Sequence, residues 1–188
     1  MTTIHGFVPV ADEHAEILIL GSMPGDASLT AGQYYAHKQN AFWRIMAELL
    51  CFDPAIPYAA KTQALRSARI ALWDVLHSCK RSGSLDSMIE IGTQIANDFS
   101  TFFRAHRNIT HVYFNGTKAD TCFKQLVAPK IESGIFRYTR LPSTSPANAS
   151  IPFERKLEAW RVILEPIRAE ATQNSECANL NMEGYRLR

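Results

Sequence analysis

Four short apolar runs alternate with helical patterns along this chain, and this alternation restricts the fold more than any other feature of the sequence. The runs are EILIL (16–20), RIALWDV (69–75), HVYFN (111–115) and FRYTRL (136–141). Each is bounded by turn-forming or polar residues and has the length of a buried strand. Strands that alternate with helices form parallel βαβ units. We therefore predict an α/β fold, a three-layer sandwich with a central four-stranded, mainly parallel sheet flanked by helices.

The segments between these runs carry apolar residues at helical spacing. They predict helices over 41–50, over 117–128 with Thr117 as N-cap, over 152–170, and two shorter helices within 85–105. Pro152 lies near the first turn of the last helix, where proline is tolerated, and Pro166 is expected to bend or end it. Residues 1–170 are predicted to form one domain, and residues 171–188 a weakly ordered tail.

Composition narrows the class of protein. The chain has 188 residues, of which 46% are hydrophobic and 20% charged, and a net charge of +2 that neither requires nor excludes an anionic partner. Its four cysteines form no CxxC pair, which argues against a disulfide framework or a zinc site. No apolar run reaches the roughly 20 residues that span a membrane, and no signal peptide is visible. We expect a soluble, cytoplasmic monomer without membrane contact.

An unusual segment follows each predicted strand: GSMPG (21–25), WDVLHSCKRSGS (73–84), NGTK (115–118) and LPSTSPANAS (141–150). In open α/β sheets, ligands bind beyond the carboxyl ends of the strands. All four segments are therefore expected at one edge of the sheet, where they would form a single site.

Two of these segments have competing interpretations. GSMPG lets backbone approach a ligand at Gly21 and Gly25, or is a tight turn; it is neither a GxGxxG fingerprint nor a P-loop, so no nucleotide cofactor is supported. LPSTSPANAS offers hydroxyls and amides before a helix, which suits a phosphate, although serine and asparagine also favour ordinary capped loops.

A third segment, GQYYAHKQNAFW (32–43), is too aromatic for a simple connection. Its rings can stack on a nucleobase, or Phe42 and Trp43 begin a helix and point into the core, which is the better explanation for Trp43. Asn40 is either an N-cap or a residue that orients a water molecule. His37 is either a phosphate donor or a surface residue.

Several enzyme chemistries find little support. No GxSxG elbow, local cysteine signature or cluster of metal ligands is visible, so no metal is expected. Asp26 and Asp74 leave a paired-carboxylate glycosidase conceivable, but the sequence does not give their separation. Amides, hydroxyls and aromatic rings remain, which favours catalysis by positioning and electrostatic stabilisation.

The GxxPG turn, the segment YAHKQNAFW and the SPAN loop together resemble the uracil-DNA glycosylase superfamily, over roughly residues 14–168. The first two motifs are similar to its mismatch-specific branch. WDVLHSCKRSGSLD with LPSTSPAN resembles its hypoxanthine (deoxyinosine) DNA glycosylase group. The resemblance implies a monofunctional DNA glycosylase that uses no cofactor. Such an enzyme flips a deaminated base, hypoxanthine first and uracil or xanthine second, from double-stranded DNA and hydrolyses its N-glycosidic bond.

The sequence departs from the commonest pattern of that superfamily at two positions. Met23 stands where many members have an Asp or Asn that positions the water, and the resemblance transfers this role to Asn40. Leu141 stands near the place of a histidine that contacts uracil in many members, so the departing base must be stabilised by other groups. Because of these two departures, a second interpretation stays open: a non-catalytic nucleic-acid-binding module on the same fold.

The resemblance and the motifs together imply the following roles. Asn40 is the catalytic residue. The base is bound by Phe42, which stacks on it, with Gly21, Met23, Asp74 and Tyr35. DNA phosphates are bound by Ser22, His37, Lys38, Ser143 and Ser145. Pro146, Ala147 and Asn148 form a wedge in the minor groove. Lys80 and Arg81 are candidates for backbone contacts or are solvated surface charges.

Overall fold

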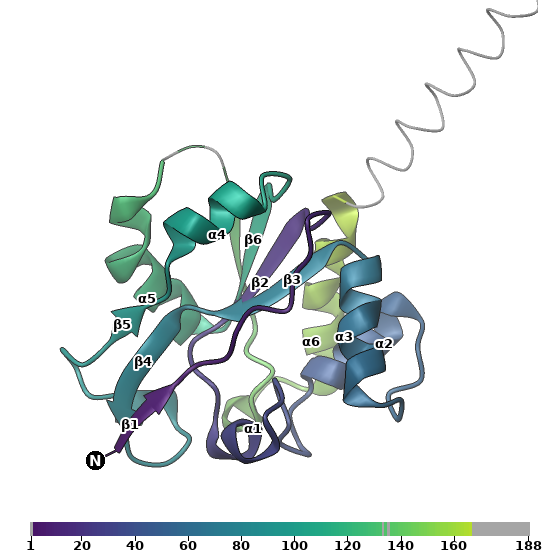
Figure 1. The fold of residues 1–188 in the computed structure, drawn as a ribbon. Coiled ribbons are helices and arrows are strands. Elements are labelled where there is room, and N and C mark those ends of the chain that lie inside the picture. The colour runs from purple at the N-terminus through teal and green to yellow at the C-terminus, as the bar shows by residue number, and fades with distance from the viewer. Residues whose placement is uncertain (1, 133, 135, 167–188) are drawn as a thin grey trace, which may run out of the picture.

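A parallel sheet of four strands forms the centre of the molecule (Figure 1). This computed structural model describes residues 2–132, 134 and 136–166. The strands are β2 (Ile17–Gly21), β3 (Ile70–Asp74), β6 (His111–Asn115) and β7 (Arg137–Leu141), in the spatial order β3-β2-β6-β7. They coincide with the four apolar runs, and the predicted α/β fold is confirmed.

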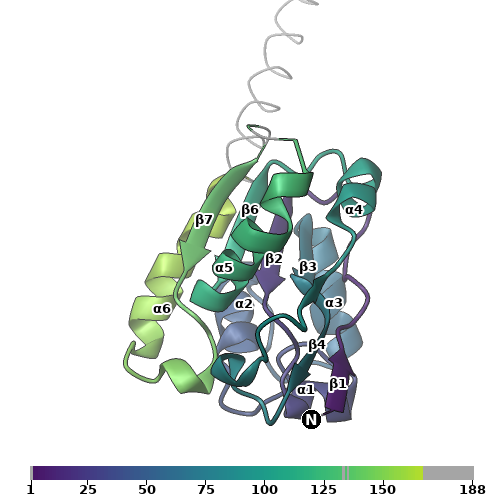
Figure 2. The same ribbon diagram turned by 90° about the vertical axis from the view of Figure 1, so that its left-hand side faces the viewer.

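Helices cover both faces of this sheet (Figures 1 and 2). One face carries α2 (Phe42–Leu50), α3 (Tyr58–Ser67) and α6 (Phe153–Trp160), and the other carries α4 (Phe99–Ala105) and α5 (Thr117–Leu126). The remaining helix and the 3-10 turns are α1 (Asp26–Ala31), η1 (Asp86–Met88), η2 (Ala128–Lys130), η3 (Pro146–Asn148) and η4 (Arg161–Leu164). Gly116, not Thr117, is the N-cap of α5.

A second sheet was not predicted. It is antiparallel and contains β1 (Thr2–His5), β4 (Leu76–Arg81) and β5 (Ile95–Ala96) in the order β1-β4-β5. The expected first helix within 85–105 is wrong, because that segment holds only η1 and β5 before α4. Apolar residues at helical spacing misled the prediction, since Leu85 and Ile91 are exposed instead of facing the core.

The remaining sequence expectations concern the chain ends and its compartment. The predicted tail, residues 171–188, lies outside the described residues, so the domain boundary at 170 stays a prediction. Cys51, Cys79 and Cys122 are free thiols. Within residues 2–132, 134 and 136–166, none of the helices has the length and apolar character needed to cross a membrane.

Candidate active site

One cavity of about 910 Å³ lies at the carboxyl edge of the parallel sheet. Its wall contains residues from all four segments that the sequence placed there: the 21–28 turn, Asp74 with Ser84–Asp86, the 115–117 turn, and the loop from Arg140 to Asn148. The aromatic loop adds Tyr34, Tyr35, His37 and Asn40. This volume is in the upper part of the range for small-molecule sites and is sufficient for a nucleoside.

Gly21 ends β2 beside Asp74, the last residue of β3, in a register that pairs the two. A Cβ atom on Gly21 would lie 2.2 Å from Asp74 Oδ1 and 3.0 Å from the Tyr35 hydroxyl oxygen. Only glycine therefore lets these two side chains approach the strand end. Met23, in the same turn, is 7% exposed and adds an apolar wall without a group that can orient water.

The contact at Gly21 gives a direct prediction. Gly21→Ala should push the Asp74 carboxyl and the Tyr35 ring out of place and destabilise the protein by about 1–3 kcal/mol, the usual cost of overpacking. Chemical unfolding and excision assays measure both effects. Gly83→Ala is the control for a glycine-to-alanine substitution that makes no new contact, because its Cβ would meet nothing within 4 Å. Its φ of +72° adds backbone strain. Unchanged activity in Gly21→Ala would contradict the tight contact.

Asp74 is a buried carboxyl group in the wall of the cavity. Its Oδ2 atom is buried and has no hydrogen-bond partner among the described residues. Burial and, secondarily, the charge of Asp86 raise the pKa of Asp74 to about 8, with Arg81 acting in the opposite direction. The ionised form is destabilised because a buried carboxylate loses hydration that nothing replaces. At neutral pH the side chain is therefore mainly a neutral acid that can donate a hydrogen bond.

Ser22 and Asp86 form a second polar pair in the wall. The Ser22 hydroxyl donates to Asp86 Oδ1 at 2.6 Å, so the predicted phosphate ligand is already engaged with a carboxylate. Burial raises the pKa of Asp86, and the Ser22 hydrogen bond and Arg81 oppose this effect. Arg81 itself is buried and donates to the Pro24 and Gly83 carbonyls, so its predicted role in contacting the DNA backbone is wrong.

Tyr34 and Tyr35 both line the cavity, and of the two Tyr35 is half-buried whereas Tyr34 is only 3% exposed. Phe42 is completely buried and does not line the cavity, and its ring packs against Tyr35 with centroids 4.1 Å apart. The structure therefore corrects the sequence prediction for Phe42: the first residue of α2 turns its ring into the core, where it also meets Trp160. Tyr35 has a φ of 55°, an uncommon backbone for a bulky residue that is frequent at functional sites.

Asn40 lies in the wall of the cavity immediately before α2. Its Oδ1 atom accepts a hydrogen bond from the Phe42 N–H at 3.0 Å, and its own N–H donates to the His37 carbonyl. The first of these bonds fixes the orientation of the amide, whose nitrogen has no partner among the described residues. Ala41, not Asn40, is the N-cap of α2, so the N-cap interpretation of Asn40 is wrong. The role of Asn40 in orienting a water stays a prediction, and its NH₂ group is available for it.

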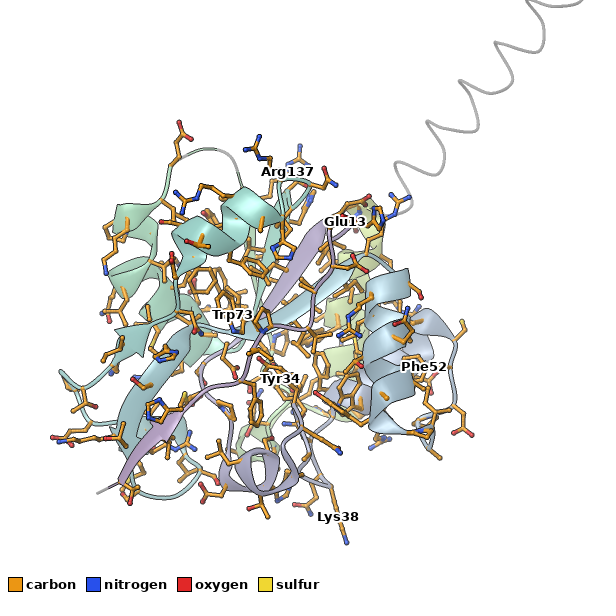
Figure 3. The ribbon with its side chains drawn as sticks, in the orientation of Figure 1. Glu13, Tyr34, Lys38, Phe52, Trp73 and Arg137 are labelled. Atoms are coloured by element: carbon orange, nitrogen blue, oxygen red, sulfur yellow. The ribbon has the colours of Figure 1, made fainter. Side chains whose placement is uncertain are left out.

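His37 and Lys38 are exposed on the same loop, and His37 lines the cavity. The Nδ1 atom of His37 accepts from the Gln39 N–H, which leaves Nε2 as its outward atom. Lys38 extends away from the ribbon at the lower edge of the molecule, below Tyr34 (Figure 3). Both side chains are accessible to a phosphate, and their predicted role stays a prediction.

The last loop is tied down by its own hydrogen bonds. Buried Thr144 exchanges two bonds of 2.8 Å with the Asn115 side chain, and its carbonyl accepts from the Ala41 N–H. The Ser145 hydroxyl oxygen accepts from the Ala147 N–H at 3.2 Å, and the Ser143 hydroxyl oxygen accepts from the Ser145 N–H. Each hydroxyl keeps its hydrogen for a phosphate oxygen, as the phosphate prediction requires.

The predicted wedge, Pro146, Ala147 and Asn148, forms the 3-10 turn η3 at the rim of the cavity. Asn148 is held by its amide, which donates to the Ser143 carbonyl, and by its carbonyl, which accepts from the Lys156 ammonium at 2.8 Å. These two hydrogen bonds anchor the turn to its own loop and to α6, and its role as a minor-groove wedge stays a prediction.

The amino end of α5 also lines the cavity, at Gly116 and Thr117. The free N–H groups there carry a partial positive charge, which favours a developing negative charge. The segment NGTK was expected at this edge, but no role was predicted for it. The signal was the glycine before a helix, which has a φ of +95°.

Metal ligands are scattered. No group of three or more His, Cys, Asp or Glu side chains among residues 2–132, 134 and 136–166 is arranged to hold a metal ion.

Fold and site together define an α/β protein with a polar, ring-lined cavity at the carboxyl edge of its sheet. The sequence pattern of the uracil DNA glycosylase superfamily matches residues 8–164. The chain belongs to this superfamily, whose members are hydrolases that release bases from DNA, and the resemblance found in the sequence is confirmed.

Similar proteins are named more narrowly. The chain is 36% identical over 159 residues to a hypoxanthine DNA glycosylase of Methanosarcina acetivorans, covering 84% of this chain and 96% of that protein. It is 43% identical over 115 residues to a hypoxanthine DNA glycosylase of Methanosarcina barkeri, covering 61% and 72%. A solution NMR structure of a candidate uracil DNA glycosylase from Methanosarcina acetivorans matches with a TM-score of 0.74 and 33% identity, over 89% of this chain and 99% of that one.

Proposed function

We propose that this protein is a monofunctional DNA glycosylase that excises hypoxanthine from double-stranded DNA and thereby starts base excision repair, with uracil and xanthine as further substrates. The observation that carries the proposal is one cavity lined by a flat ring, an available amide and a neutral carboxylic acid, from Tyr35, Asn40 and Asp74. The relatives named hypoxanthine DNA glycosylase support the choice of base.

The reaction follows from these groups. The flipped base stacks on the Tyr35 ring. As the bond between C1′ and the base nitrogen breaks, the electron pair goes to the base and the sugar becomes an oxocarbenium ion. A water held by the Asn40 amide adds its oxygen to C1′, and the proton that it loses passes through solvent to the base anion, or to Asp74 when that group has already protonated the base. Asp74, as a neutral acid, donates a hydrogen bond or its proton to the departing base, and the amino end of α5 stabilises negative charge there.

This role for Asp74 answers the difficulty raised by Leu141. A carboxylate would repel an anionic base, whereas a protonated Asp74 assists it. Leu141 is buried at the end of β7, and its carbonyl accepts from the Gly116 N–H. Its apolar side chain offers no hydrogen bond to the departing base.

Excision assays on a panel of duplexes test the proposed function. Duplexes carrying hypoxanthine, uracil, xanthine or a thymine mismatch are incubated with the protein and cleaved by alkali at abasic sites. We expect the fastest release from hypoxanthine. Tight duplex binding with no abasic product from any base would instead support the non-catalytic binding module. Monomeric state and cytoplasmic location stay predictions.

The pKa of Asp74 predicts how activity depends on pH. If neutral Asp74 assists the departing base, the single-turnover excision rate should fall about tenfold per pH unit above about 8. Asp74→Asn should be slower but flat in this range, because an amide does not ionise there. A rate that rises through pH 8 would mean that the ionised carboxylate is the active form.

The same pKa predicts how stability depends on pH. The folded pKa is raised from 3.8 to about 8, so between these values the folded protein keeps a proton that the unfolded chain has lost. The contribution of Asp74 to the free energy of unfolding is therefore largest below pH 3.8. It falls by about 1.4 kcal/mol per pH unit as the pH rises toward 8. Urea unfolding at several pH values should show this loss in the wild type and not in Asp74→Asn. Parallel curves for the two proteins would exclude a raised pKa.

A further inference from the structure

A smaller hollow of about 240 Å³ lies on the other side of the aromatic loop. It shares Tyr35, His37 and Asn40 with the main cavity, so the two hollows are neighbours separated by these side chains. We call it the cationic groove, because Lys38, Arg44 and Lys61 line it. No glycosylase role described above uses Arg44 or Lys61.

The charged side chains that line the groove are all positive. None of the described residues that line it carries a carboxylate, and Lys38, Arg44 and Lys61 form no ion pair within the described part of the chain. The Arg44 guanidinium lies 4.2 Å above the Phe153 ring, and the Lys61 ammonium lies 5.9 Å from the Trp43 ring. These rings orient the two cations without neutralising them.

The wall behind the cations is held by hydrogen bonds. The Trp43 indole N–H donates to the Tyr34 carbonyl at 2.8 Å, and the Tyr34 N–H donates to the Tyr58 hydroxyl oxygen at 3.1 Å. The loop, α2 and α3 are thereby joined at the groove. A ligand therefore meets cations at largely preset positions, which lowers the entropic cost of binding.

The main cavity has the opposite character. Its wall contains the acidic side chains of Asp26 and Asp86 besides the neutral Asp74, and the basic side chains among its described lining residues are His37 and Arg140. Arg140 lies 3.9 Å from Asp120, which weakens its attraction for another anion. DNA that places a nucleotide in this cavity must find most of its charge neutralisation beside the cavity, not inside it.

We propose that the cationic groove binds backbone phosphates of the DNA next to the flipped nucleotide, with Arg44 and Lys61 as phosphate ligands in addition to Lys38. The inference rests on the proposed function, because it assumes that DNA occupies the main cavity. A groove of this size accommodates a phosphate with part of its sugar, and its three cations favour the anionic phosphate over a neutral base.

The test compares Arg44→Gln/Lys61→Gln with the wild type for binding to a duplex carrying one deoxyinosine, over a series of salt concentrations. Each phosphate contact contributes about 0.9 to the slope of log K against log salt concentration. The double variant should lower the slope by about 1 to 2. The single-turnover rate at saturating enzyme should fall much less than the affinity, because neither side chain lines the base cavity.

A matched control is Lys130→Gln/Arg137→Gln, which removes the same charge from exposed positions on η2 and at the start of β7. Arg137 lies at the edge of the molecule opposite Lys38 (Figure 3). The slope of log K against log salt concentration for this control variant should equal that of the wild type. An equal fall in both variants would mean that net charge alone is responsible and would overturn the proposal.

Neutral methylphosphonate groups placed one at a time along the duplex identify the phosphates. In the wild type, one or two positions near the deoxyinosine should weaken binding, and at those positions Arg44→Gln/Lys61→Gln should show no further loss. Losses that are additive everywhere would overturn the proposal. A changed slope without excision of any base would reject the proposed enzyme and keep the groove, whereas excision with an unchanged slope would reject the groove alone.

Discussion

Asn40→Ala should lower the single-turnover rate of hypoxanthine excision by about 100- to 1000-fold, while affinity for the damaged duplex changes little. This range is typical for the loss of one preorganised polar group that acts in the transition state. Asn40 is suited to this role because its oxygen is held by the Phe42 N–H, whereas its amide nitrogen is available in the cavity. Met23, in the turn after β2 that also lines the cavity, has no polar group to compensate.

Two further variants separate catalysis from folding. Asn40→Ala also removes the hydrogen bond from the Phe42 N–H, which has a stability cost of about 0.5–1.5 kcal/mol. Asn40→Ser keeps an oxygen that can accept this bond, so it should recover stability without activity. Asn40→Asp keeps the oxygen and loses the NH₂ donor. Near-normal excision by Asn40→Ala would refute the assignment of Asn40, and activity in Asn40→Asp would show that the oxygen, not the NH₂ group, holds the water.

Tyr35→Ala should weaken capture of the flipped base by about 1–3 kcal/mol, the usual contribution of one aromatic ring stacked on a base. This corresponds to a loss of about 5- to 150-fold in affinity for the damaged duplex over the undamaged one. Tyr35→Phe is the matched control, because it keeps the ring and removes only a buried hydroxyl that has no hydrogen-bond partner among the described residues. Its discrimination should stay close to that of the wild type.

Phe42→Ala distinguishes the two aromatic residues. Because Phe42 is completely buried against Tyr35 and Trp160, its truncation should lower stability by about 3–5 kcal/mol, as large-to-small core substitutions do. Thermal unfolding measures this loss. A Phe42→Ala protein that is as stable as the wild type but fails to discriminate the damaged base would return the stacking role to Phe42.

The sequence predicted the central sheet well, for a physical reason. A buried parallel strand is a continuous apolar run, so Ile17–Gly21 and Ile70–Asp74 are visible without knowledge of their neighbours. The same local signal failed for the short elements. The segment 85–96 contains apolar residues at helical spacing, yet Leu85 and Ile91 are exposed and β5 has two residues. Elements this short depend on their partner strands more than on their own pattern.

The sequence predicted the location of the candidate site more successfully than the role of each residue in it. Asn40, Met23 and Asp74 line one cavity because parallel strands bring their carboxyl ends to the same edge, a rule that needs only the strand assignment. The stacking role predicted for Phe42 does not fit its complete burial, whereas Tyr35, also a predicted base ligand, lines the cavity. Both are rings in one motif, and the direction of each ring depends on the positive φ of Tyr35 and on where α2 begins.

Local sequence patterns are therefore enough to predict the α/β class, the resemblance to the glycosylase superfamily and the edge of the sheet that carries the site. It is not enough for interactions between distant residues. Asp74 is a neutral acid only because it is buried beside Asp86, and Gly21 is required only because Asp74 and Tyr35 converge on it. The cationic groove likewise exists because the loop, α2 and α3 meet. Burial and side-chain neighbours arise from strand order and register, and these are properties of the folded molecule.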